Sequence, residues 1–204
     1  MHENIRQLGL VKLVQVQPSG LIIETPTGYI YDPSRRVEVD HVRITNRGIE
    51  ATSPTGERLL DIHHSDHPET HSEGDNAISI GFTSHYAAMR ARFGEHMELG
   101  SAGENIIIDY HNEVWLEDLG QVVIIQNPDT GHRALLDVIK IAAPCEEFSH
   151  FAAGSQHDRL PANVLKSTLQ FLGNGRRGFL LALSDGQDSA EVHPGDRVFV
   201  DLTS

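Results

Sequence analysis

Cysteine and histidine are the residues of this sequence whose types and spacing could do chemistry. The one cysteine, Cys145, follows Pro144 at the predicted start of a helix. Backbone N–H groups and the helix dipole stabilise an anion there, so we expect a lowered thiol pKa, although Glu146 and Glu147 act against it. Such a thiolate can be a nucleophile, a persulfide carrier or a ligand for a soft metal such as molybdenum. The alternative is a small buried apolar residue.

A histidine-rich segment, residues 61–76, is the second candidate. His63, His64, His67 and His71 fall within nine residues, among interspersed aspartate and glutamate. Imidazole and carboxylate groups are ligands of zinc, iron and nickel, so one interpretation is a metal-dependent enzyme with His63, His67 and His71 as ligands. Two alternatives stay open: a solvated polar loop, or histidines that bind an anionic ligand.

A short motif leads directly into a predicted strand. Gly103, Glu104 and Asn105 precede the apolar run Ile106–Asp109. Small and polar residues at a strand start let a ligand approach the backbone closely. We therefore expect these three residues to contribute to a binding site.

A glycine-rich loop, residues 173–178, presents two arginines in a strongly acidic protein. Guanidinium groups match phosphate and carboxylate geometry. We expect Arg176 to bind an anionic group and Arg177 to be a solvated residue of a helix-to-strand connector.

Short strands must position most of these residues. Their spacing and glycine- or proline-containing turns indicate a mainly β fold, an antiparallel sandwich or barrel. A phase change near Asp40-His41 predicts a β-bulge. Thr83 or Ser84 is expected to cap a helix that ends at Gly94. The expected strands are 8–16, 21–24, 29–31, 37–39, 42–44, 106–109, 113–116, 121–126, 135–141, 178–183 and 196–202, with further helices over about 145–153 and 161–172.

Composition excludes several classes of protein. The 204 residues are expected to form one domain, 1–204, and a single cysteine cannot form an internal disulfide. The net charge of −13 disfavours binding to nucleic acid or to an anionic membrane. No targeting or membrane segment is visible, so we expect a cytoplasmic protein.

Four motifs in order resemble the MOSC domain, the module at the C-terminus of molybdenum cofactor sulfurases. They are Gly103 to Ile106, Ala143-Pro144-Cys145, Gly178-Phe179 and the segment Val192 to Val198. The similarity spans about residues 60–202. It implies a closed or partly open β-barrel, of the pyruvate kinase β-barrel type, with a few peripheral helices. The segment 61–76 departs from the pattern, because many members carry a Gly-Gly pair there.

The resemblance implies that Cys145 is the functional cysteine and that a molybdenum cofactor is a candidate ligand. A sulfurtransferase would use Cys145 as a nucleophile, whereas a reductase of N-hydroxylated compounds would use it as the molybdenum ligand. The expected partners are a sulfur donor such as a cysteine desulfurase, or an electron-transfer protein, and no pyridoxal phosphate is expected in this chain. A non-catalytic cofactor-binding module is a further alternative. The expected cofactor-binding residues are His63, His64, His67, Gly103, Glu104, Asn105 and Arg176.

Overall fold

The computed structural model describes residues 5–26, 28–70, 77–156 and 158–202, and within them the chain is mainly β. The strands are β1 (Ile5–Val16), β2 (Ile22–Thr25), β3 (Gly28–Tyr31), β4 (Val37–Val39), β5 (Val42–Thr45), β6 (Gly48–Thr52), β7 (Arg58–Leu60), β8 (Ile78–Phe82), β9 (Ile106–Asp109), β10 (Val122–Gln126), β11 (Arg133–Ile141), β12 (Phe179–Leu183), β13 (Ser189–Val192) and β14 (Arg197–Asp201). The α-helices are α1 (Thr83–Phe93), α2 (Glu146–Ala152) and α3 (Ala162–Leu172). None of the described helices is long and apolar enough to cross a membrane.

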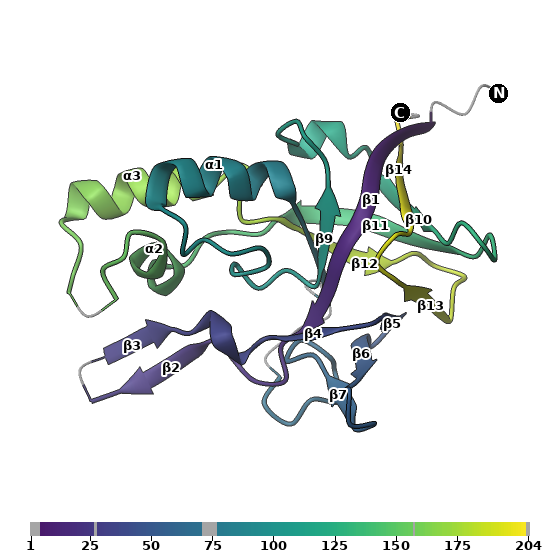
Figure 1. Cartoon of the computed structure of the whole chain (residues 1–204), viewed down its shortest axis with the longest axis horizontal. Helices are drawn as coiled ribbons and strands as arrows, with labels where there is room; N and C mark the ends of the chain where they lie inside the picture. The colour runs from purple at the N-terminus through teal and green to yellow at the C-terminus, as the bar shows by residue number, and fades with distance from the viewer. Residues whose placement is uncertain (1–4, 27, 71–76, 157, 203–204) are drawn as a thin grey trace.

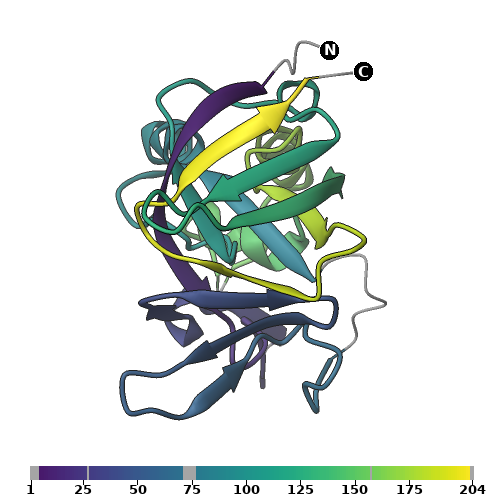
Figure 2. The ribbon, with the colours of Figure 1, turned by 90° about the vertical axis from the view of Figure 1, so that its right-hand side faces the viewer.

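A closed barrel forms the body of the molecule (Figures 1 and 2). Its strand order is β14-β10-β11-β12-β8-β9-β1, and pairing of β1 with β14 closes the ring. β1 is long enough to pair in succession with β14, β9 and β4, with register shifts between Gln7 and Gly9 and between Val11 and Leu13. Shifts of this kind bend a strand, and the bends let β1 curve around the barrel. The prediction of a mainly β barrel with peripheral helices is therefore confirmed.

The core has two parts, on either side of the barrel wall. Successive side chains of a strand point to opposite faces, so Ile106 and Ile108 of β9 join the barrel cluster. Between them, Ile107 packs with Tyr86 of α1 and Phe148 of α2 in a second cluster under the helices. Burying each such side chain contributes about 1.5–3 kcal/mol. The wall strands are thereby fixed from both sides.

Two smaller elements extend the barrel at one end (Figure 1). The sheet β13-β5-β6-β7 packs its buried apolar residues into the barrel cluster. The hairpin β2–β3 extends away from this sheet, and Tyr31 at its end packs against Phe148 and Phe151 of α2. The hairpin thus leans on the helical side of the molecule.

The predicted bulge at Asp40-His41 is wrong. β4 pairs with β1 in the barrel sheet, whereas β5 pairs with β6 and β13 in the smaller sheet. The chain changes sheets between the two strands, and this change accounts for the phase slip. The strand predicted at 113–116 is also wrong, because the chain forms a 3-10 turn at Leu116–Asp118, where the Asp118 carboxylate accepts a hydrogen bond from the Trp115 N–H.

The first helix begins without the predicted side-chain cap. α1 starts at Thr83, with Phe82 at the N-cap position. The Thr83 hydroxyl instead donates to the Asp109 carboxylate or the Tyr110 carbonyl, each about 3 Å away. It therefore ties the helix start to the end of β9.

Candidate functional site

A cavity of about 430 Å³ opens between the barrel, the β2–β3 hairpin and α2. Cys145, His63, Gly103, Glu104 and Arg177 line it, although they come from four distant parts of the sequence. The volume lies in the range of small-molecule sites, about 300–1,000 Å³. The barrel thus brings the thiol and part of the histidine segment to one cavity.

Cys145 occupies the N-cap position of α2. Its Sγ accepts a hydrogen bond from the Phe148 N–H at 3.4 Å, and the side chain is partly exposed to the cavity. Burial raises the pKa of the Cys145 thiol, although the Phe148 N–H and the Arg177 guanidinium act to lower it and Glu147 adds to the rise. The expectation of a lowered thiol pKa is wrong, because removal from water outweighs the helix start.

The two neighbouring arginines have different surroundings. Arg176 donates to the Glu113 carboxylate at 2.8 Å and to the Phe171 carbonyl at 3.1 Å, and its guanidinium also lies over the Trp115 ring. Arg176 does not line the cavity. Arg177 does line it, and its side chain makes no hydrogen bond or ion pair with the described residues. Arg177 is therefore the cation that is available to an anionic ligand.

His63 lines the cavity, and its ring is hydrogen-bonded to the buried carboxylate of Asp61. Asp61 is 0 % exposed, and its Oδ1 lies 2.8 Å from Nδ1 of His63. The same Oδ1 accepts a hydrogen bond from the His63 N–H, and Oδ2 accepts from the Gln17 N–H and from Nδ2 of Asn105. Asp61 thus connects the histidine segment to the end of β1 and the start of β9.

The other histidines of the segment serve the turns instead of the cavity. His64 is fully buried, and its Nδ1 accepts the N–H of Asp66. His67 accepts the N–H of Glu69 through Nδ1, and its Nε2 lies 3.1 Å from the Pro18 carbonyl. The structure therefore does not bring His64 or His67 to the cavity, and His71 lies outside the described residues. Within the part of the chain that is described, no three histidine, cysteine, aspartate or glutamate side chains form a group that could hold a metal.

The segment before β9 forms a wall of the cavity. Gly103 adopts φ +91°, and a Cβ at this position would lie 2.9 Å from Nε2 of Gln17, which donates to the Gly103 carbonyl. Gln15 donates in the same way to the carbonyls of Gly100 and Glu104. Asn105 is buried and does not line the cavity, because its side chain holds Asp61 and Ser79.

Glu104 is a buried carboxyl in this wall. It is 2 % exposed, its Oε2 accepts a hydrogen bond from the Tyr86 hydroxyl at 2.5 Å, and its Oε1 has no hydrogen-bond partner in the described structure. Burial raises its pKa to about 7, against the opposing effects of the Tyr86 hydroxyl and of the cations Arg177 and Arg36. The Glu104 carboxyl therefore changes its charge near neutral pH.

A family model supplies the deciding comparison. The model of the MOSC domain matches residues 61–199. This chain belongs to the MOSC domain family. The match contains Cys145, the Gly103 to Asn105 motif and Arg177, so every part of the cavity except the end of β1 and the hairpin lies inside the family region.

Solved structures with TM-scores above 0.5 share the fold of this MOSC protein at low sequence identity. The YUAD protein from Bacillus subtilis is 13% identical, with a TM-score of 0.60 and coverage of 97% of each chain. A hypothetical protein of known crystal structure is 14% identical, with a TM-score of 0.52, over 96% of this chain and 70% of the other. YiiM from Geobacillus stearothermophilus is 16% identical, with a TM-score of 0.49, over 97% and 75%. No curated protein gave a significant sequence match.

The sequence-based predictions missed the roles of Arg177, which lines the cavity, and of Asp61, which bonds His63 from the protein interior. The sequence predicts Arg177 in a solvated connector, yet it lines the cavity, and the glycine that follows it has φ +105° and directly precedes β12. Asp61 was noted only among the acidic residues of the histidine segment. Its spacing of two residues from His63 was the available signal, because an aspartate can bond the backbone two residues on.

Proposed function

We propose that this MOSC protein carries sulfur as a persulfide on Cys145. One observation supports the proposal most directly: the thiol opens onto a cavity that also holds the unpaired guanidinium of Arg177. A persulfide is readily ionised, and a cation in a partly dehydrated cavity stabilises it more than water alone does. The cavity also leaves room for a sulfur acceptor beside the thiol.

The loading step conserves atoms and charge. The Cys145 thiolate attacks the outer sulfur of a donor persulfide, the S–S bond of the donor breaks, and the donor leaves as a thiolate. The proton that Cys145 loses to solvent is matched by the one that the departing thiolate takes up. A cysteine desulfurase is a donor of this chemistry, and its pyridoxal phosphate would remain on the donor protein.

A molybdenum cofactor is the second candidate occupant, and the residues of the cavity fit one. The sulfur of Cys145 is a soft ligand for the metal, and Arg177 has free N–H donors for an anionic group. Cys145 would hold the metal and Arg177 the anionic end of the cofactor. The bound cofactor would supply two-electron chemistry for reducing N-hydroxylated compounds, with electrons from a partner protein.

One experiment separates the two functions. The purified protein is incubated with inorganic polysulfide and, separately, with isolated molybdenum cofactor, and then freed of excess reagent. We expect an added sulfur atom on Cys145 by mass spectrometry, and no addition to a Cys145→Ser variant. Stoichiometric molybdenum that is lost in Cys145→Ser, with no persulfide, would favour the cofactor function. Neither modification would indicate a module in which Cys145 has no chemical role.

A further inference from the structure

We infer that His63, oriented by Asp61, is the base that deprotonates a thiol acceptor of the sulfur carried by Cys145. The inference rests on the proposed function and adds both a residue role and a class of acceptor. Its first basis is the position of His63, which lines the same cavity as Cys145 although the two residues are distant in sequence. The imidazole is therefore placed to act on a molecule bound beside the thiol.

The hydrogen bonds of Asp61 fix which ring nitrogen of His63 carries the proton. The buried carboxylate accepts four hydrogen bonds, from His63 N–H and Nδ1 and from Gln17 and Asn105. A carboxylate only accepts, so the proton of the neutral ring sits on Nδ1. The lone pair of Nε2 is left free, which is the arrangement in which an aspartate orients a basic histidine.

The free nitrogen has no other task in the described structure. Nε2 of His63 has no hydrogen-bond partner there, and the side chain is 34% exposed. His67 differs, because both of its ring nitrogens have backbone partners. The titratable and charged side chains around the cavity and behind it are Asp61, Glu69, Glu104, Tyr31, Cys145 and Arg177.

The transfer step conserves atoms and charge. Nε2 takes the proton of the acceptor thiol, and the resulting thiolate attacks the outer sulfur of the Cys145 persulfide. The S–S bond to Cys145 breaks, the acceptor leaves as a persulfide, and Cys145 becomes a thiolate. The imidazolium of His63 then returns its proton, through solvent, to Cys145. No oxidant or reductant is consumed, because the sulfur moves without a net change in electrons.

A pair of acceptors tests the role of His63 in a single turnover. The protein is loaded with polysulfide, and sulfur release is timed with glutathione, which must lose a proton, and with sulfite, whose dianion is abundant near pH 7 and attacks without losing a proton. We expect His63→Gln to slow transfer to glutathione by up to about 30-fold at pH 7, because a thiol with an ordinary pKa of about 8.5 is only about 3% ionised there without a base. Sulfur release to sulfite is expected to keep its rate. His67→Gln, the matched control, is expected to change neither rate.

The pH dependence gives a readout that a structural role would not change. Above about pH 8.5, free thiols ionise without a base, so the His63→Gln rate with glutathione is expected to approach the wild-type rate. Equal slowing with both acceptors, or no slowing with glutathione, would overturn the role of His63. Failure of Cys145 to take up sulfur would instead overturn the proposed function.

A second measurement tests the hydrogen bond between Asp61 and His63 without any turnover. The ¹⁵N chemical shifts of the His63 ring report which nitrogen carries the proton in the wild-type protein. We expect the Nδ1–H form at pH 8. A proton on Nε2 would leave no lone pair toward the cavity and would overturn the inference, whether or not Cys145 accepts sulfur.

Discussion

Neighbouring residues at this site have opposite roles, and the role follows from the direction of each side chain. Arg176 donates hydrogen bonds to Glu113 and Phe171 and stacks on Trp115. The side chain of Arg177 has no hydrogen-bond or ion-pair partner among the described residues and lines the cavity. His63 and His64 divide in the same way between the cavity and the buried turn. At the residue scale, the chemistry of the site depends on which of two adjacent side chains faces inward.

The arginine pair allows a matched test of the thiol. Arg177 lowers the pKa of Cys145, so Arg177→Met is expected to raise that pKa and slow alkylation by iodoacetamide at pH 8. The slowing is on the order of 3- to 10-fold, because the thiolate reacts and one pKa unit changes its amount about tenfold. Arg176→Met is expected to leave the rate unchanged while lowering the free energy of unfolding. Equal rates in wild type and Arg177→Met would contradict the assignment.

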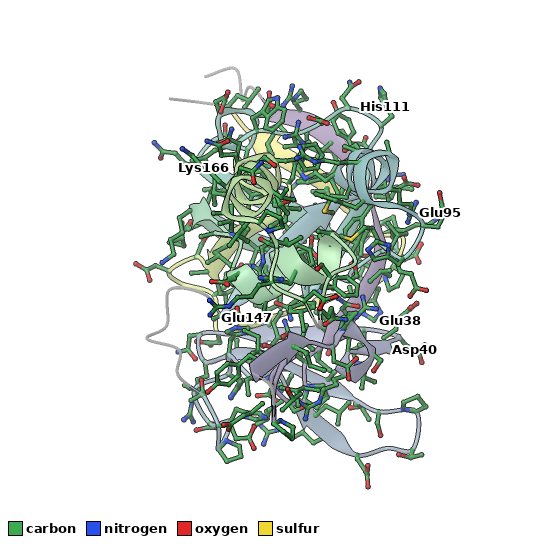
Figure 3. All side chains as sticks on the ribbon, turned by 90° about the vertical axis from the view of Figure 1, so that its left-hand side faces the viewer. Glu38, Asp40, Glu95, His111, Glu147 and Lys166 are labelled. Atoms are coloured by element: carbon green, nitrogen blue, oxygen red, sulfur yellow. The ribbon has the colours of Figure 1, made fainter. Side chains whose placement is uncertain are left out.

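Glu104 gives a prediction about stability and pH. Its pKa is raised from 4.5 to about 7 in the folded protein, so between these values the folded state binds more protons than the unfolded state. The contribution of Glu104 to stability is therefore fully present below about pH 4.5 and is lost as pH rises through 7. From pH 5 to 8, Glu104→Gln is expected to gain stability relative to wild type, by up to about 3 kcal/mol in urea unfolding. Exposed Glu95→Gln is the control, and a flat difference for Glu104→Gln would refute the prediction (Figure 3).

At the scale of elements, the cavity is built from segments that other elements hold at their ends. Gln15 and Gln17 fasten the wall before β9, and Tyr31 of the hairpin donates its hydroxyl hydrogen to the Ser101 carbonyl of the same wall. The thiol sits where β11 passes into α2. The barrel strands themselves contribute little chemistry, and their ends carry the functional groups.

The glycine just before β12 has no room for a side chain. Gly178 has φ +105°, and a Cβ there would lie 2.5 Å from the Ile80 carbonyl oxygen and 2.9 Å from Cγ of Glu104. Gly186 has φ +88° with open space around it, so Gly186→Ala measures the cost of the positive φ without a steric contact. Gly186→Ala is expected to cost about 1–2 kcal/mol and Gly178→Ala on the order of 3 kcal/mol or more, measured by urea unfolding. Similar costs for both would show that the contact with Ile80 relaxes freely.

At the scale of the whole molecule, the first strand makes the barrel a single unit. The family match begins at residue 61, yet β1 pairs with β14, β9 and β4 and closes the ring. The fragment 61–199 is therefore expected to remain unfolded by far-UV circular dichroism. A native-like spectrum of that fragment would show that β1 is dispensable.

Charge is also a property of the whole molecule. The net charge is −13, and acidic side chains such as Glu38, Asp40 and Glu95 lie along one edge of the face in Figure 3. The cavity differs from this surface, because Arg177 and the imidazole of His63 line it together with Glu69 and Glu104. An anionic ligand would meet a local cation inside an otherwise acidic protein.

Local patterns predicted what local forces decide. The apolar runs and helical spacing within single segments predicted β1, β10, β11, β14 and α3. These patterns depend on neighbouring residues in the sequence, so no distant contact was needed to predict them. Closure of the barrel was not predicted in detail, because pairing of Ile5 with Asp201 joins the two ends of the chain. The raised pKa of Cys145 was missed for a similar reason, since the residues that bury it are distant in sequence.

The raised pKa of Cys145 affects how readily peroxide oxidises this thiol. Peroxide attacks the thiolate and converts it stepwise to sulfenic, sulfinic and sulfonic acids, the last two of which are damage. A thiol kept protonated by burial in the resting protein presents little thiolate to such attack. In the proposed persulfide function, the resting Cys145 would thereby resist oxidation, and a reactive sulfur would be present only after a persulfide has formed.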